Sequence, residues 1–131
     1  MDLAREQEIK ALVCELCRQF YQLGWVTGTG GSISIRQDDY IFMTPSGVQK
    51  ERIKPNQVFI VGFDGKVIKQ PDAGPSKLSD CAPLFLHAYN QRQAGKQQRV
   101  KSSLSTCLCI CNLFWVYLQG PCCTVTASTA T

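Results

Sequence analysis

The sequence predicts an α/β domain, because two helical patterns flank four strand patterns along its first 95 residues. An amphipathic helix over residues 5–24 is followed by two pairs of short strands, over residues 33–43 and 58–68. A second helix is expected to begin at Ser79 or Asp80. With 131 residues and a mass of 14.6 kDa, the chain has the size of one domain. Its 44% apolar and 18% charged residues allow a core and argue against global disorder.

The first helix is predicted from apolar residues that recur every three or four positions, which places them on one face. Glu6 and Glu8 lie in the early turns, where the helix dipole favours negative charge, and Gly24 supplies a C-terminal stop. The apolar residues of this face are Ile9, Leu12, Val13, Leu16, Phe20 and Leu23.

The strands are predicted to pair as two hairpins. Residues 33–35 and 40–43 form the first pair, with a turn at residues 37–39. Residues 58–61 and 66–68 form the second pair around an Asp-Gly turn.

The second helix is expected to tolerate Pro83 in its first turn. His87 lies off the apolar face, so we expect it to be a surface residue. That face is expected to consist of Cys81, Leu84, Phe85, Ala88 and Tyr89.

The composition changes after Gly95. The segment 96–131 contains no acidic residue and holds five of the eight cysteines. Its apolar run, residues 107–118, is too short to cross a bilayer as a helix. The run is compatible with a buried strand or with a segment prone to association. We expect residues 96–131 to be a divergent, poorly ordered tail that did not evolve with the rest, as an altered reading frame or a splice product would produce.

The charge pattern of residues 1–95 shows no basic patch and does not imply binding of nucleic acid. The formal net charge of +4 comes from 14 Lys and Arg against 10 Asp and Glu, and residues 1–95 are almost balanced. The chain does not open with the charged and then apolar regions of a secretory signal. We therefore expect a cytoplasmic protein with free thiols and with neither a nucleic-acid nor a membrane partner.

Two small-residue turns are the strongest candidates for a binding site. The glycine turn (residues 28–32, Gly-Thr-Gly-Gly-Ser) and the serine turn (Ser46 and Gly47) can bring backbone N–H groups and hydroxyls close to a phosphate. Neither turn matches a dinucleotide-binding or P-loop motif. The alternative is that both are ordinary turns that need positive φ.

Other polar residues have weaker patterns. Cys81, in the first turn of the second helix, is either a thiol that faces a bound anion or a small core residue. Residues 50–54 carry three cations that we expect on a solvated edge, with phosphate steering as the alternative: Lys50, Arg52 and Lys54. Three cysteines would share one side of a strand, but their spacing is not that of a zinc knuckle: Cys107, Cys109 and Cys111.

Three segments resemble the class II aldolase/adducin family, and within it the methylthioribulose-1-phosphate dehydratase branch. They are GWVTGTGGS at residues 24–32, TPSGVQKERI at residues 44–53 and CAPLF at residues 81–85. The first two are specific to the dehydratase branch. The resemblance covers residues 5–95, which we interpret as the N-terminal half of the family domain.

The resemblance implies an α/β/α fold around a mainly antiparallel sheet, and a homotetramer with sites between subunits. It implies that Gly31, Ser32, Ser46 and Gly47 hold a sugar phosphate, methylthioribulose 1-phosphate, and that Cys81 contacts this substrate. In the family, a zinc held by three histidines polarises the ketose and a glutamate moves protons while water is lost.

The chain departs from the family after residues 92–95. An apolar strand ending in His-x-His is expected next, and Lys96-Gln97-Gln98-Arg99 stands there instead. The only histidine, His87, precedes this point and matches no zinc-ligand position. We therefore predict no metal ligand and no catalytic residue in this chain. Two hypotheses remain: a weakly active or inactive dehydratase form, or a non-catalytic truncated isoform that interacts with the full-length subunit.

Overall fold

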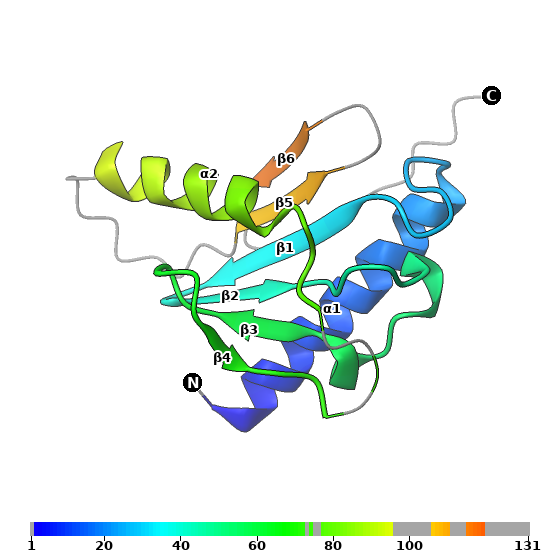
Figure 1. Ribbon diagram of the computed structural model, residues 1–131, viewed down its shortest axis with the longest axis horizontal. Coiled ribbons are helices and arrows are strands. Elements are labelled where there is room, and N and C mark those ends of the chain that lie inside the picture. The colour runs from blue at the N-terminus through cyan, green and yellow to red at the C-terminus, as the bar shows by residue number, and fades with distance from the viewer. Residues whose placement is uncertain (1, 73, 75–76, 96–105, 111–114, 120–131) are drawn as a thin grey trace.

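An antiparallel sheet lies between two helices (Figure 1). The computed structural model describes residues 2–72, 74, 77–95, 106–110 and 115–119, with side chains described up to residue 91. Within these residues the strand order is β4-β3-β2-β1-β5-β6, and every pairing is antiparallel. The strands are β1 (Ser32–Gln37), β2 (Tyr40–Met43), β3 (Phe59–Val61), β4 (Val67–Lys69), β5 (Thr106–Ile110) and β6 (Trp115–Gln119).

Strand residues alternate between the two helices, which makes the fold α/β/α. On β2, Phe42 packs against α1 (Leu3–Gln22), whereas its neighbours Ile41 and Met43 pack against α2 (Ala82–Gly95). Because successive side chains of a strand point to opposite faces, the helices cover opposite sides of the sheet. The predicted fold class is confirmed.

The first predicted helix is confirmed as α1. Its predicted apolar face is largely buried, with Leu16 and Phe20 each 1% exposed. The chain leaves the helix at Gly24, whose φ of +74° suits glycine. Beyond this turn the ring of Trp25 stacks on that of Phe20 at a centroid distance of 5.0 Å. This contact brings the chain back over the helix end and into the glycine turn.

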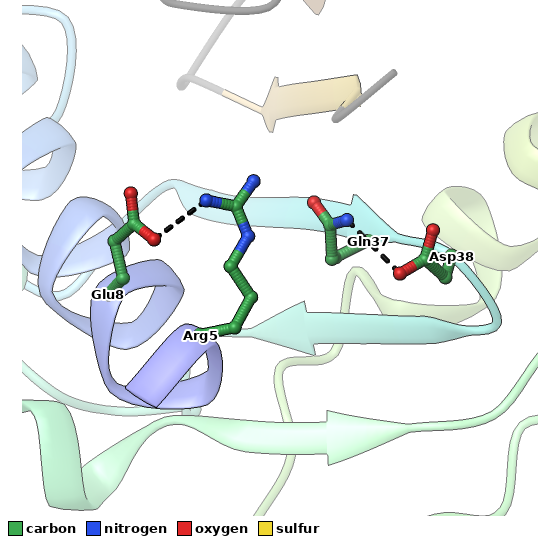
Figure 2. A network of polar contacts seen from close by, with 4 residues as sticks. All are labelled: Arg5, Glu8, Gln37 and Asp38. Carbon is green, nitrogen blue, oxygen red and sulfur yellow. Dashed lines mark hydrogen bonds and ion pairs between the residues drawn. The ribbon is translucent and has the colours of Figure 1, made fainter. Parts of the chain in front are cut away.

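Both predicted hairpins are also confirmed. The turn between β1 and β2 contains Asp38, whose φ of +52° is left-handed. Asp38 is stabilised there by Gln37, which donates a side-chain hydrogen bond to Asp38 Oδ2 at 3.1 Å (Figure 2). Such a conformation suits a tight antiparallel hairpin.

The second helix differs from its prediction in two respects. It begins at Ala82 instead of Ser79 or Asp80, because the Ser79 carbonyl and hydroxyl accept the N–H groups of Ala82 and Cys81 and hold a turn ahead of the helix. Its buried face runs through three residues spaced by three and four: Ala82, Phe85 and Tyr89. Leu84, predicted on this face, is 51% exposed, since it lies one position away from the buried stripe.

Residues 96–131, predicted to be a divergent tail, contribute two strands to the sheet. The hairpin of β5 and β6 falls in the apolar run predicted as a strand or an associating segment, and β5 pairs with β1. The edge of β1 is therefore covered. Cys111 and most of residues 96–131 lie outside the described residues, so the predicted poor order of the tail stays a prediction. Among the described helices, none is long and apolar enough to cross a membrane.

Candidate anion-binding site

The end of the glycine turn contacts Thr44, which lies two residues before the serine turn. Ser32 Oγ lies 2.8 Å from Thr44 Oγ1, and both residues are fully buried. The Thr44 hydroxyl also accepts the N–H of Ile33 at 3.2 Å, and the Thr44 N–H donates to the Ile33 carbonyl at 3.1 Å. The Ser32 hydroxyl, predicted to hold substrate, is thus bonded to Thr44 and helps to hold the two turns in place.

The serine turn is in turn joined to the segment that precedes α2. The N–H of Ser46 donates to the Lys77 carbonyl at 2.9 Å, and Pro45 forms an isolated bridge with Leu78. The Ser46 hydroxyl donates to a carboxylate oxygen of Asp80 at 3.2 Å. The structure therefore brings Ser46 next to the residue that precedes Cys81.

The glycines at the centre of both turns adopt conformations that other residues disfavour. Gly31 has a φ of +78° and Gly47 a φ of +71°. A Cβ atom built at Gly47 would meet no heavy atom within 4 Å, so the serine turn needs glycine for its backbone angle and not for space. This open space is where a ligand has room to approach the backbone.

Cys81 sits immediately before α2 and is half-buried. Its carbonyl accepts the N–H groups of Leu84 and Phe85 at 3.0 and 3.2 Å, so it closes the first turn of the helix. Its thiol is free. Cys81 therefore lies one residue before α2 instead of in its first turn, and its contact with an anion stays a prediction.

Lys50 is the main correction to the sequence prediction at this site. It was expected on a solvated edge together with Arg52 and Lys54, but it is only 2% exposed, whereas the other two are exposed. The reason is the 3₁₀ turn η1 (Lys50–Arg52): with three residues per turn, Lys50 falls on the same side as the buried Ile53.

The buried ammonium of Lys50 connects both turns. Its Nζ donates to the Thr29 carbonyl at 3.1 Å and to the Val48 carbonyl at 2.9 Å. Burial lowers the pKa of Lys50, and the negative charges that Cys17, Cys81 and Glu51 can carry act in the opposite direction. A cation therefore lies at the junction of the glycine turn and the serine turn, within electrostatic range of Cys81.

Asp80 introduces a negative charge at the outer side of the same site. Lys77 Nζ lies 2.7 Å from its Oδ1. The hydrogen bond from Lys77, and then that from Ser46, lowers the pKa of Asp80. The Ser46 hydroxyl is thus held by a carboxylate, which is itself paired with Lys77.

Sequence reasoning missed Asp80 and Thr44, and it gave Lys50 only the alternative role of phosphate steering. The contacts that join Lys50 and Asp80 to the turns are long-range: Lys50 bonds to Thr29, 21 residues away, and Asp80 to Ser46, 34 residues away. Thr44 had a usable signal: it directly follows a predicted strand and opens the Thr-Pro-Ser-Gly turn, where a hydroxyl commonly bonds to the backbone.

The donor set of the described residues does not fit a catalytic metal. No group of three His, Cys, Asp or Glu side chains comes together within that part of the chain. His87 is exposed on α2, as predicted, and belongs to no such group. No chemical step is therefore assigned to a metal held by these residues.

The fold is α/β/α, and the two turns meet in a candidate anion-binding site. Residues 11–96 match the model of the class II aldolase and adducin N-terminal domain. The chain belongs to this family. The matched range contains both turns, Lys50 and Cys81.

Sequence relatives place the chain near one enzyme of the family. It is 55% identical over 85 residues to the methylthioribulose-1-phosphate dehydratase of Xenopus tropicalis, covering 64% of this chain and 36% of that protein. The dehydratase of Xenopus laevis gives the same identity and the same coverage. The chain thus spans well under half the length of these curated relatives.

Solved structures agree on the fold. The L-fuculose 1-phosphate aldolase of Glaciozyma antarctica superposes with a TM-score of 0.62 at 15% identity, covering 82% of this chain and 41% of that one. A protein of Escherichia coli described as a putative aldolase/epimerase/decarboxylase gives a TM-score of 0.57 at 24% identity, covering 65% and 39%. These likenesses concern the fold alone.

Proposed function

We propose that this chain binds methylthioribulose 1-phosphate in the manner of the dehydratase branch, and that by itself it turns this substrate over little or not at all. The observation that carries the proposal is the 55% identity to named dehydratases over 85 residues. Within the family-matched range lie all five residues predicted to hold substrate: Gly31, Ser32, Ser46, Gly47 and Cys81.

The phosphate-binding part of the proposal rests on the two turns. Gly31 and Gly47 have positive φ, which lets a backbone approach an anion closely, and Ser46 supplies a half-buried hydroxyl. Lys50 adds a positive charge where the turns meet. Cys81, whose thiol is free, immediately precedes α2, and we assign it the contact with the sugar.

The low turnover follows from the metal chemistry of the family. Class II aldolases generally use a divalent metal, which we take to be zinc in the dehydratase branch, and a Lewis acid would ease the loss of water from a ketose phosphate. The sequence contains one histidine, and the described residues assemble no three-ligand set. The described residues therefore offer groups for the phosphate end of the substrate and no three-ligand metal set that would polarise its carbonyl.

The cellular setting is part of the same proposal. The dehydratase reaction belongs to methionine salvage, and we place the chain in this pathway and in the cytoplasm. We propose that it assembles with subunits of the same family as a homotetramer. The free thiols of Cys14, Cys17 and Cys81 are compatible with a reducing compartment.

Three measurements test the proposal. Isothermal titration of the purified chain with methylthioribulose 1-phosphate should give saturable binding, and a coupled assay after incubation with zinc should give no turnover above background. Metal analysis of the same sample should find no stoichiometric zinc. Turnover at the rate of a full-length dehydratase would contradict the proposal that the chain is inactive. Absence of sugar-phosphate binding would contradict the proposed binding site.

A further inference from the structure

We propose that Lys50 is the cationic positioning residue of this site: its ammonium holds the glycine turn against the serine turn and compensates the charge of a phosphate monoester bound between them. The inference rests on the proposed function, because it assigns a role within the proposed sugar-phosphate site. It also goes beyond that function, since it names a residue that sequence patterns place on the solvated surface.

The geometry supports the first part of this role, in which Lys50 holds the two turns together. The Thr29 carbonyl belongs to the glycine turn and the Val48 carbonyl directly follows the serine turn, and Nζ bonds to both, at 3.1 and 2.9 Å. Hydrogen bonds from a charged donor are the stronger kind, particularly where water is excluded. Removing the ammonium would leave two carbonyls without their shared donor and would free the turns to separate.

The hydrogen-bond count supports the second part of this role, the compensation of the phosphate charge. An ammonium has three N–H donors, and two of them are used on carbonyls. Among the described residues, no side-chain carboxylate lies in salt-bridge contact with Nζ. Burying a cation without a counter-ion is unfavourable, so the site is arranged to gain stability when an anion arrives.

Several charged or titratable groups face this ammonium. Cys17 comes from α1, Cys81 from the start of α2 and Glu51 from η1 itself. Burial lowers the pKa of Lys50, and an anion bound in the turns would raise it again. The affinity for phosphate should therefore fall as the pH rises towards the ordinary lysine value, because the site then loses its cation.

The variant Lys50→Met tests this role, with Lys54→Met as a matched control. Both changes remove one positive charge, but Lys54 is exposed and forms no ion pair among the described residues. Binding of methylthioribulose 1-phosphate and of inorganic phosphate is measured by calorimetry. We expect Lys50→Met to weaken both about tenfold or more, and Lys54→Met to change them less than about twofold.

The outcomes separate the inference from the proposed function. If the wild type binds and the two variants bind alike, the role of Lys50 is wrong while the sugar-phosphate site stands. If the wild type binds neither ligand, both are wrong. A ¹⁵Nζ NMR titration of the wild type covers the case in which Lys50→Met does not fold: saturation with inorganic phosphate should raise the pKa of Lys50, and no rise would overturn the inference.

Discussion

The hydroxyl of Tyr89 on α2 lies 3.0 Å from Ser34 Oγ on β1 and donates to the Ser34 carbonyl at 3.2 Å. Because Tyr89 uses its single proton on the carbonyl, the Ser34 hydroxyl donates to the tyrosine oxygen. Both residues are almost completely buried, with exposures of 1% and 0%. This reciprocal pair joins the second helix to the central strand and thereby fixes where α2, and Cys81 at its start, lie relative to the sheet.

Replacing Tyr89 by Phe should lower the free energy of unfolding by about 1–2 kcal/mol, because the buried Ser34 hydroxyl and carbonyl lose a partner. Urea unfolding followed by circular dichroism measures the change. Tyr21→Phe is the control, since Tyr21 is 45% exposed, and it should alter stability by less than about 0.5 kcal/mol. Equal effects of the two variants would mean that the buried pair contributes nothing specific.

The elements that could be predicted from sequence are those with a local pattern. The stripe from Ile9 to Phe20 determines α1, and the alternation around Ile33 and Ile35 determines a strand, because each pattern needs only neighbouring residues. The start of α2 was predicted two or three residues too early, since a serine before a helix can either cap it or, as Ser79 does, hold a preceding turn.

The site could be predicted only where its residues lie in a motif. The two turns were found because glycine and serine mark them, but their contact through Thr44 and their connection through Lys50 depend on pairing across the sheet. The burial of Lys50 was missed because alternate spacing treated residues 50, 52 and 54 alike, whereas a 3₁₀ turn separates them. The pairing of Tyr89 with Ser34, 55 residues apart, left no signal in the sequence.

Gly47 tests whether the serine turn depends on a left-handed backbone. Its φ is +71° and a Cβ there would meet no neighbour within 4 Å, so Gly47→Ala should cost about 1 kcal/mol through conformation alone. Gly47→Asn is the matched variant, because asparagine tolerates this conformation better, and it should recover part of the loss. The midpoints of urea unfolding decide; if alanine and asparagine are equally tolerated, the turn does not require positive φ.

The buried thiols predict a loss of stability at alkaline pH. Burial raises the pKa of Cys17 from 9.0 to about 12 and that of Cys14 from 9.0 to about 11. Above pH 9 the unfolded chain loses these protons while the folded chain keeps them, so the unfolded state binds fewer protons and stability falls as the pH rises. Lys50 acts with the opposite sign, because its pKa is lowered in the fold.

The variant Cys17→Ala isolates this effect from that of Lys50. Between pH 9 and 11, stability of the wild type should fall more steeply than that of the variant, by about 1.4 kcal/mol per pH unit. Urea unfolding in the presence of a reductant at a series of pH values gives both curves. Parallel curves would show that Cys17 does not keep its proton in the folded state.

Glu6 provides the matching test at acidic pH. Its Oε1 lies 2.6 Å from Lys10 Nζ and 2.8 Å from Lys69 Nζ, and hydrogen bonds from these two lysines lower the pKa of Glu6. A lowered carboxyl pKa stabilises the fold above the ordinary value of 4.5, and this stabilisation is lost as the pH falls. Glu6→Gln should therefore lower stability at pH 7 by about 1–2 kcal/mol and flatten the acidic limb of the stability curve.

Glu8→Gln is the control: its ion pair with Arg5 is exposed (Figure 2), and the loss should stay below about 0.5 kcal/mol because exposed pairs contribute little. Since Glu6 joins α1 to β4, an equal response of the two variants would mean that this edge of the sheet is held by packing and not by charge.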